Sequence, residues 1–188
     1  MMKKIILASA LVFGTTAVTA PVLFANSEQA HATKQGITDV KKMKKTLTVK
    51  GVTLNKTTYK NVVKKWGKPT STTTKAYVHG GYEYVATFKN GYKVGFNVNS
   101  KKEKPQSDST VDSIEFKLAN KVTYGELKKV YKELYAEYSS KTKKHAVSVY
   151  IGNGFVVQMD FKSAKATQKK IKNTTVLETV KLSCFPEY

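Results

Sequence analysis

Apolar residues recur with helical spacing shortly after residue 55. Tyr59, Val62, Val63 and Trp66 fall at i, i+3, i+4 and i+7, which predicts a helix with one apolar face. Thr57 or Thr58 supplies an N-cap, and the helix is expected to end at Gly67, before Lys68-Pro69.

The same spacing returns further along the chain. Thr123 and Glu126 form a capping box, in which each residue satisfies a free backbone N–H of the other. The stripe that follows runs further than the first one and predicts a longer second helix, with apolar positions at Leu127, Val130, Tyr131, Leu134 and Tyr138.

A strict alternation of apolar with polar or smaller residues after the first helix predicts a hairpin. A two-residue loop, Asn90-Gly91, would place the two apolar rows on opposite faces of the sheet, whereas a three-residue loop, Lys89-Asn90-Gly91, pairs Phe88 with Tyr92 and keeps them together. We therefore expect one apolar face from Tyr82, Tyr84, Ala86 and Phe88 with Tyr92, Val94, Phe96 and Val98.

A second hairpin follows the same arithmetic. The loop Gly152-Asn153-Gly154 pairs Ile151 with Phe155, and further back it pairs Val149 with Val157 and Val147 with Met159. A third strand is expected after each hairpin, near Val111–Leu118 and Val176–Cys184.

Three landmarks indicate an internal repeat of about 64 residues. Asn55-Lys56-Thr57-Thr58-Tyr59 returns as Asn120-Lys121-Val122-Thr123-Tyr124, Asn90-Gly91 returns as Asn153-Gly154, and Lys117-Leu118 returns as Lys181-Leu182. The predicted fold class is α+β, with two tandem repeats of one helix plus an antiparallel three- or four-stranded sheet and both helices on one face. The predicted organisation is a signal peptide over 1–32, a basic segment over 33–52, repeat 1 over 53–118 and repeat 2 over 119–188.

The first 32 residues are typical of an export signal. Lys3 and Lys4 precede an apolar run that Gly14 and Pro21 interrupt, and Ala30-His31-Ala32 provides small residues for cleavage. A retained membrane anchor is the alternative. We expect cleavage after Ala32 and a secreted, extracellular chain, associated with the cell surface at most by its charge.

The face of the sheet opposite the helices is expected to be open. Such a face is either solvated or able to bind a protein. Our candidates for protein contact on it are Thr87, Lys93, Ser148, Tyr150 and Gln158.

The chain is strongly basic, and all of this charge is lysine. It has 188 residues, 33 Lys+Arg against 13 Asp+Glu and a net charge of +20, and no arginine occurs in it. Lysine is a point charge without the planar fork of arginine, so any polyanion binding is expected to be non-specific. Solubility alone is the other interpretation of this charge.

Two lysine-rich loops are the candidates for polyanion binding. They follow the second strand of each repeat, and we expect them to emerge at one end of the sheet. Their lysines are Lys101, Lys102, Lys104, Lys162, Lys165, Lys169, Lys170 and Lys172. A further run, Lys41, Lys42, Lys44 and Lys45, is expected to lie on a flexible arm.

No pattern indicates catalysis. His79 and His145 lack metal-binding spacing. Cys184 shares the parity of Val180 and Leu182 on the last strand, which predicts a buried thiol rather than a nucleophile. One cysteine cannot form a disulfide within its own chain. We expect a non-enzymatic protein with no cofactor and no metal.

The motif Val62-Val63-Lys64-Lys65-Trp66-Gly67-Lys68-Pro69, followed by aromatic strands and Asn90-Gly91-Tyr92, resembles the repeat of the beta-lactamase inhibitory protein and SmpA/OmlA-like group. That resemblance implies action by protein contact. The second copy, from Leu127 to Phe161, is also similar to the immunodominant staphylococcal antigen B family, which implies a small secreted Gram-positive protein facing the host.

These observations predict a secreted, non-catalytic protein that binds an unknown protein partner through the open sheet face, in an inhibitor-like or host-directed role. The alternative is a polyanion binder whose lysine-rich loops contact extracellular nucleic acid, teichoic acid or sulfated glycan.

Overall fold

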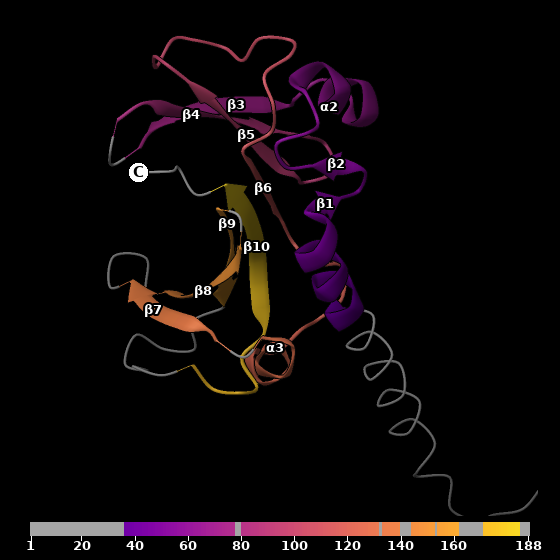
Figure 1. Cartoon of the computed structure of the whole chain (residues 1–188), viewed down its shortest axis with the longest axis vertical. Coiled ribbons are helices and arrows are strands. Elements are labelled where there is room, and N and C mark those ends of the chain that lie inside the picture. The colour runs from indigo at the N-terminus through magenta and orange to yellow at the C-terminus, as the bar shows by residue number, and fades with distance from the viewer. Residues whose placement is uncertain are drawn as a thin grey trace, which may run out of the picture.

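The described part of the chain is α+β, with one large antiparallel sheet, a small two-stranded sheet and three helices (Figure 1). This computed structural model describes residues 36–77, 80–131, 133–139, 144–152, 154–161 and 171–184. The predicted signal peptide, residues 1–32, lies outside the described residues.

The first described element is a helix over residues 36–46. The elements that follow are β1 (Thr48–Val49), β2 (Val52–Thr53), α2 (Tyr59–Trp66), β3 (Ser71–Ala76), β4 (Tyr82–Thr87), β5 (Lys93–Val98), β6 (Ser113–Phe116), α3 (Tyr124–Val130), β7 (Tyr135–Ser139), β8 (Lys144–Gly152), β9 (Phe155–Phe161) and β10 (Leu177–Cys184).

The large sheet has eight strands in the order β3-β4-β5-β6-β10-β9-β8-β7. The first half of the chain supplies β3 to β6 and the second half supplies β7 to β10. The two halves meet where β6 pairs antiparallel with β10, from Ser113 opposite Ser183 to Phe116 opposite Val180. They therefore form one continuous sheet.

Each half contains one helix followed by four strands, and equivalent backbone contacts tie each helix down. The N–H of Tyr59 donates to the carbonyl of Ser109, as that of Tyr124 does to Thr175. Isolated bridges join Thr58 to Thr110 and Thr123 to Val176. In both halves, the start of the helix is thus attached to the segment that leads into the last strand.

Helix α2 begins and ends as the sequence predicts. Thr58 occupies the N-cap position, although its side chain makes no capping hydrogen bond, and Gly67 ends the helix with a φ of 83° that a glycine adopts without strain. Tyr59 packs edge-on against Phe96, and Trp66 does the same against Phe88. The apolar face of α2 therefore covers the first half of the sheet.

Helix α3 has the predicted capping box, in which Thr123 and Glu126 bond to each other's backbone N–H groups. Its predicted length is wrong, because the helix ends at Val130 and the backbone at Tyr131 is already extended. Residues Tyr135–Ser139 instead form β7, which pairs with β8 along the edge of the sheet. Long-range pairing overrides the local helical spacing here.

The first hairpin has the predicted register. The N–H of Phe88 donates to Tyr92, Gly91 has a φ of 80°, and Tyr84 and Ala86 face Phe96 and Val94. The apolar row is therefore continuous on one face.

The second hairpin differs from the prediction at its tip. Val149 pairs with Val157 and Val147 with Met159, as predicted, but Gly152 rather than Ile151 is opposite Phe155. The register shifts between Tyr150 and Gly152, so a bulge at Ile151 absorbs one residue.

The segment before the repeats is not a flexible arm, and this prediction was wrong. Residues 36–46 are helical, and Val40 and Met43 are buried in the core while the lysines of this helix are exposed. Gly36 lies so close to Val122 that a Cβ there would collide with it. Lys44 stands 4.9 Å above the ring of Tyr131. The helix therefore contacts residues of the second half.

The described helices and the small sheet lie on one side of the large sheet, which curves away from them, so that the opposite face is concave and carries none of the described helices (Figure 1). The core lies between the sheet and the helices, and its largest fully buried side chains include Phe88, Phe96, Phe161 and Leu127. No helix in the described ranges combines the length and apolar character that a membrane crossing requires.

Among the described residues, the hydroxyl of Tyr131 is the buried side-chain polar atom without a hydrogen-bond partner, and its side chain is 3% exposed. Burial raises the pKa of this group to about 12. An unsatisfied buried hydroxyl costs about 1–3 kcal/mol.

We therefore predict that Tyr131→Phe leaves the free energy of unfolding unchanged or raises it by about 1 kcal/mol, as measured by urea unfolding. Val180→Thr is the opposite control, because it adds an unpaired hydroxyl at a fully buried position. A loss of more than 1 kcal/mol for Tyr131→Phe would mean that the hydroxyl has a partner.

Candidate protein-contact surface

All five residues predicted for protein contact lie on the concave face, in two neighbouring rows. Register places Lys93 opposite Thr87 and Glu115, and Gln158 opposite Lys181 and Ser148. Because Glu115 also pairs with Lys181, these residues form one continuous row across the sheet.

Tyr150 belongs to the next row of the concave face. It pairs with Val156 of β9, Val156 pairs with Ser183 of β10, and Ser183 pairs with Ser113 of β6. Gly95 of β5 completes the row opposite Ser113. In this row Val156, Ser183 and Ser113 lie between Tyr150 and Gly95, whereas in the first row Glu115 and Lys181 lie between Lys93 and Gln158.

Tyr150 is the most prominent side chain on this face. It is 59% exposed and is the large hydrophobic residue that stands out from the described surface. Val156 beside it is almost fully buried, and Ser148 and Gln158 flank it in the other row. Tyrosine offers a protein partner apolar area together with a polar tip.

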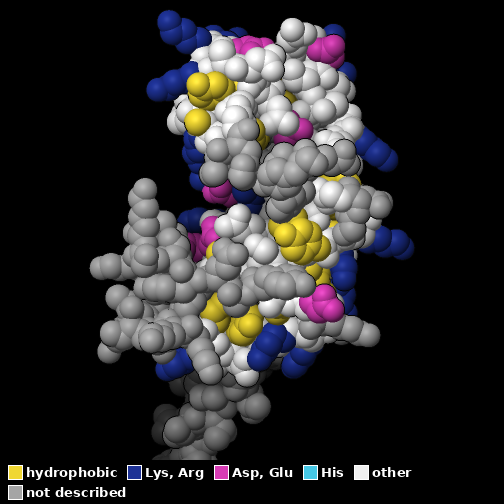
Figure 2. Space-filling view, turned by 60° about the vertical axis from the view of Figure 1, so that its left-hand side comes forward, with side chains coloured by type: hydrophobic (Ala, Val, Ile, Leu, Met, Phe, Trp, Pro, Cys, Tyr) yellow, Lys and Arg dark blue, Asp and Glu magenta, His cyan; other side chains and the backbone are white. Residues whose placement is uncertain are grey.

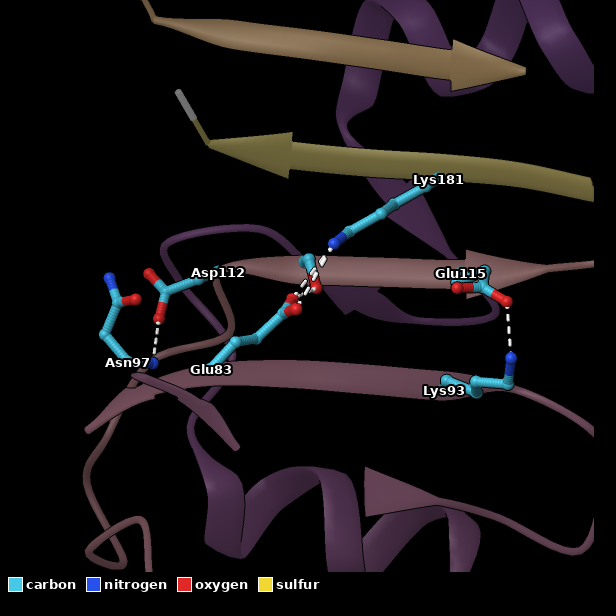
Figure 3. A network of polar contacts seen from close by, with 7 residues as sticks. Glu83, Lys93, Asn97, Asp112, Glu115 and Lys181 are labelled. Atoms are coloured by element: carbon cyan, nitrogen blue, oxygen red, sulfur yellow. Dashed lines mark hydrogen bonds and ion pairs between the residues drawn. The ribbon is translucent and has the colours of Figure 1, made fainter. Parts of the chain in front are cut away.

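The centre of the concave face contains a buried carboxylate. Glu83, on β4, is only 6% exposed. It accepts a hydrogen bond of 2.6 Å from the hydroxyl of Ser113, and it forms an ion pair of 3.1 Å with the ammonium of Lys181 (Figure 3). These contacts cross β5 and connect the two halves of the chain.

Gly95 makes this crossing possible. A Cβ at this position would collide with both the hydroxyl of Ser113 and the carboxylate of Glu83. The glycine therefore leaves the space through which Glu83 reaches over β5.

The second ion pair of the network is more exposed. Lys93 contacts Glu115 at 2.6 Å, with exposed side-chain fractions of 45% and 30% (Figure 3). A pair of this kind contributes about 0–1 kcal/mol to stability. It orients both side chains along the row without fixing the fold.

Asp112 and Cys184 lie next to each other at the end of the β6–β10 pair, where the N–H of Cys184 donates to the carbonyl of Asp112 and the thiol packs against the core on the helix side. Asp112 accepts a 2.6 Å hydrogen bond from the backbone N–H of Asn97 (Figure 3). Burial raises the pKa of this carboxyl, the charge of Glu83 raises it further, and the bond from Asn97 opposes the shift. The thiol of Cys184 donates to the side-chain oxygen of Asn55 at 3.1 Å.

The thiol is held in its neutral form. Burial and the charge of Asp112 raise the pKa of Cys184 to about 11, although its hydrogen bonds oppose the shift. Since the thiolate is the nucleophile, this environment is opposite to that of a catalytic cysteine.

The strand ends that flank the two predicted lysine-rich loops lie at opposite ends of the sheet. The first loop, residues 99–112, leads from β5 to the Ser113 end of β6. The second loop connects Phe161 of β9 with Leu177 of β10, and both of these residues lie towards the Phe116 end of β6. Because β6 and β10 are antiparallel, these are opposite ends of the sheet, and the expectation of a shared end was wrong. Lys101, Lys102, Lys104 and Lys172 are exposed. Lys162, Lys165, Lys169 and Lys170 lie outside the described residues.

Many other lysines are exposed on the helix side of the sheet. They belong to the helix over 36–46, the turn between β1 and β2, α2 and α3, and they are Lys41, Lys42, Lys44, Lys45, Lys50, Lys60, Lys64, Lys65, Lys128 and Lys129. In the view towards the concave side, lysine side chains project mainly from the margins (Figure 2).

The sequence prediction missed Glu83, Glu115 and Lys181. All three occupy the polar positions of alternating strands, so their face could have been predicted from parity. The ion pair from β4 to β10 could not, because its partners are 98 positions apart.

Within the ranges that the structure describes, no three His, Cys, Asp or Glu residues come together as a metal site would require. Comparisons with protein-family models, with curated proteins and with solved structures found no match. The candidate site therefore rests on its geometry.

We predict that Gly95→Ala lowers the free energy of unfolding by about 1–3 kcal/mol, because the new methyl group must displace Ser113 or Glu83. Asn97→Ala, at the next concave-face position of the same strand, is exposed and should change stability by less than about 0.5 kcal/mol. Equal losses in urea unfolding of the two variants would contradict the crossing contact.

We also predict slow alkylation of Cys184. Its pKa of about 11, against an ordinary 9.0, implies about 100-fold less thiolate at pH 8 than in the unfolded chain. Iodoacetamide labelling followed by mass spectrometry, with and without urea, measures the ratio of the alkylation rates in the unfolded and folded chain. As a control, Thr72→Cys on the exposed edge strand, combined with Cys184→Ser, should react similarly in both states; similar rates for Cys184 itself would contradict the prediction.

Proposed function

We propose that this chain is a secreted, non-catalytic binding protein of a Gram-positive bacterium that contacts a protein partner through the concave face of its sheet. The observation that carries the proposal is Tyr150, a 59% exposed aromatic side chain on a sheet face that none of the described helices covers. Exposed tyrosines of this kind are enriched among the residues that dominate binding energy.

The neighbourhood of Tyr150 supports this role. Ser148 and Gln158 offer hydrogen-bonding groups in the adjacent row, and the row continues through Lys181 and Glu115 to Lys93. Strand side chains on a continuous sheet need little ordering when a partner binds, which lowers the cost of association.

We further infer that the two halves are copies of one unit, over 53–118 and 119–188. The paired helix-to-strand hydrogen bonds, Tyr59 to Ser109 and Tyr124 to Thr175, support this inference together with the recurring sequence landmarks. The resemblance to the beta-lactamase inhibitory protein and SmpA/OmlA-like group agrees with an inhibitor-like contact, and that to the staphylococcal antigen B family with a host-directed one. Secretion follows from the export signal proposed for 1–32.

Polyanion binding through the lysine-rich loops has less support. The strand ends that flank the two loops lie at opposite ends of the sheet, which does not favour one shared basic patch. A non-specific polyanion binder would lose affinity steeply as salt increases. The same experiment therefore separates the two functions.

The test is affinity capture with the chain over 33–188, from culture medium and solubilised envelope of the producing bacterium and from host serum, at physiological and at high salt. We predict a protein that is retained at high salt and whose affinity falls about 30-fold with Tyr150→Ala, a loss of the size found for central interface tyrosines.

The matched control is Lys60→Ala on α2, an exposed residue on the opposite side of the sheet. It should leave capture unchanged. Labelled duplex DNA and a wall-type polyphosphate are titrated in parallel. Retention that falls equally in both variants, or binding of polyanions alone with a steep salt dependence, would overturn the proposal.

A further inference from the structure

A pocket lies on the helix side of the protein, away from the concave face. It has a volume of about 280 Å³ and lies between the helix over 36–46, the hairpin of β1 and β2, and the end of β6. This volume is close to the lower limit of about 300 Å³ for small-molecule sites.

The floor of the pocket is apolar. Met43 comes from the helix, Val49 from β1 and Phe116 from β6, and each is at most 6% exposed. Tyr92 and Leu118 complete the apolar lining. An apolar body of a few carbon atoms placed here would be removed from water on several sides.

The rim of the pocket is basic. Lys42, Lys50 and Lys117 line it and are exposed. Lys65 lies close to Gly51 of the lining, because its Nζ is 3.2 Å from the position that a Cβ on Gly51 would take. Asp39 is the carboxylate of the lining, and its charge contributes, after burial, to the raised pKa of Tyr92. The lysines outnumber it, so the mouth attracts anions.

Lys50 occupies a backbone position that does not suit it. It has a φ of 47° and Gly51 a φ of 77°, so the two residues form the turn that joins Val49 to Val52 with both φ angles positive. Asn, Asp or Gly is strongly preferred at the first position of such a turn. A lysine there strains the backbone, and strain of this kind clusters at ligand sites. Lys50 also lines the pocket.

We propose that this pocket binds a small anionic amphiphile. Its apolar body packs against Met43, Phe116 and Leu118, and its carboxylate or phosphate group lies between Lys50, Lys42 and Lys117. Lysine ammonium groups accept either anion, because they do not impose the planar geometry of arginine. The site is separate from the concave face and is independent of the protein contact proposed above.

The fluorescence of Trp66 provides the measurement. It is the single tryptophan of the chain, and its ring centroid lies 5.0 Å from that of Tyr92 in the pocket wall. The chain over 33–188 is titrated with octanoate, octyl phosphate and octanol, each below its aggregation concentration. We expect saturable binding of the two anions and binding of octanol that is at least about 10-fold weaker, as the loss of a charge-assisted hydrogen bond implies. The stronger of the two anions identifies the head group.

Two variants make the test decisive. Lys50→Asn should weaken binding of the anions about 5- to 10-fold and at the same time raise the melting temperature, because asparagine tolerates the left-handed turn. Lys60→Asn removes one charge from the exposed side of α2 and should leave affinity unchanged. Non-saturable binding, equal affinity for octanol, or equal weakening in the two variants would overturn the proposal.

Discussion

The pairing of β6 with β10 is the contact on which the rest of the structure depends. It joins two four-stranded sheets that would otherwise each expose a long unpaired edge, a form that is prone to aggregation. Glu83 reinforces the junction by reaching over Gly95 to Ser113 and Lys181. A carboxylate buried this deeply is stable only when its partners are present. The ion pair between Glu83 and Lys181 therefore favours the strand order in which β5 and β6 lie between β4 and β10.

Joining the halves also determines what each side of the sheet presents. The helices bury the apolar rows on one side, and the opposite rows become one concave surface that carries Lys93 in one row and Tyr150 in the next. Many of the exposed lysines of the described chain lie with the helices, whereas Lys93 and Lys181 on the concave face are paired with carboxylates. The polar, charge-balanced face suits a protein partner, and the basic side suits anions.

The sequence predicts the features that depend on local chemistry. Asn90-Gly91 specifies the first turn and its register, Gly67 ends α2, and Thr123 with Glu126 begins α3. Residues Tyr135–Ser139 were wrongly assigned to a helix because their apolar spacing fits both the helical period and the two-residue period of a strand. Only their pairing with β8 decides between helix and strand. The helix over 36–46 has a local signal, the apolar spacing of Ile37, Val40 and Met43, which its lysines obscured. The opposite positions of the basic loops depend on the β6–β10 register, which no local pattern encodes.

The central claim is that the concave face contacts a protein partner, and site-specific photo-crosslinking tests it most directly. A photo-reactive amino acid replaces Tyr150 in one sample and Lys60, on the exposed side of α2, in another, and each is irradiated with the captured partner at high salt. Our account predicts a crosslinked product from position 150 and none from position 60. A crosslink from position 60 without one from position 150 would contradict it.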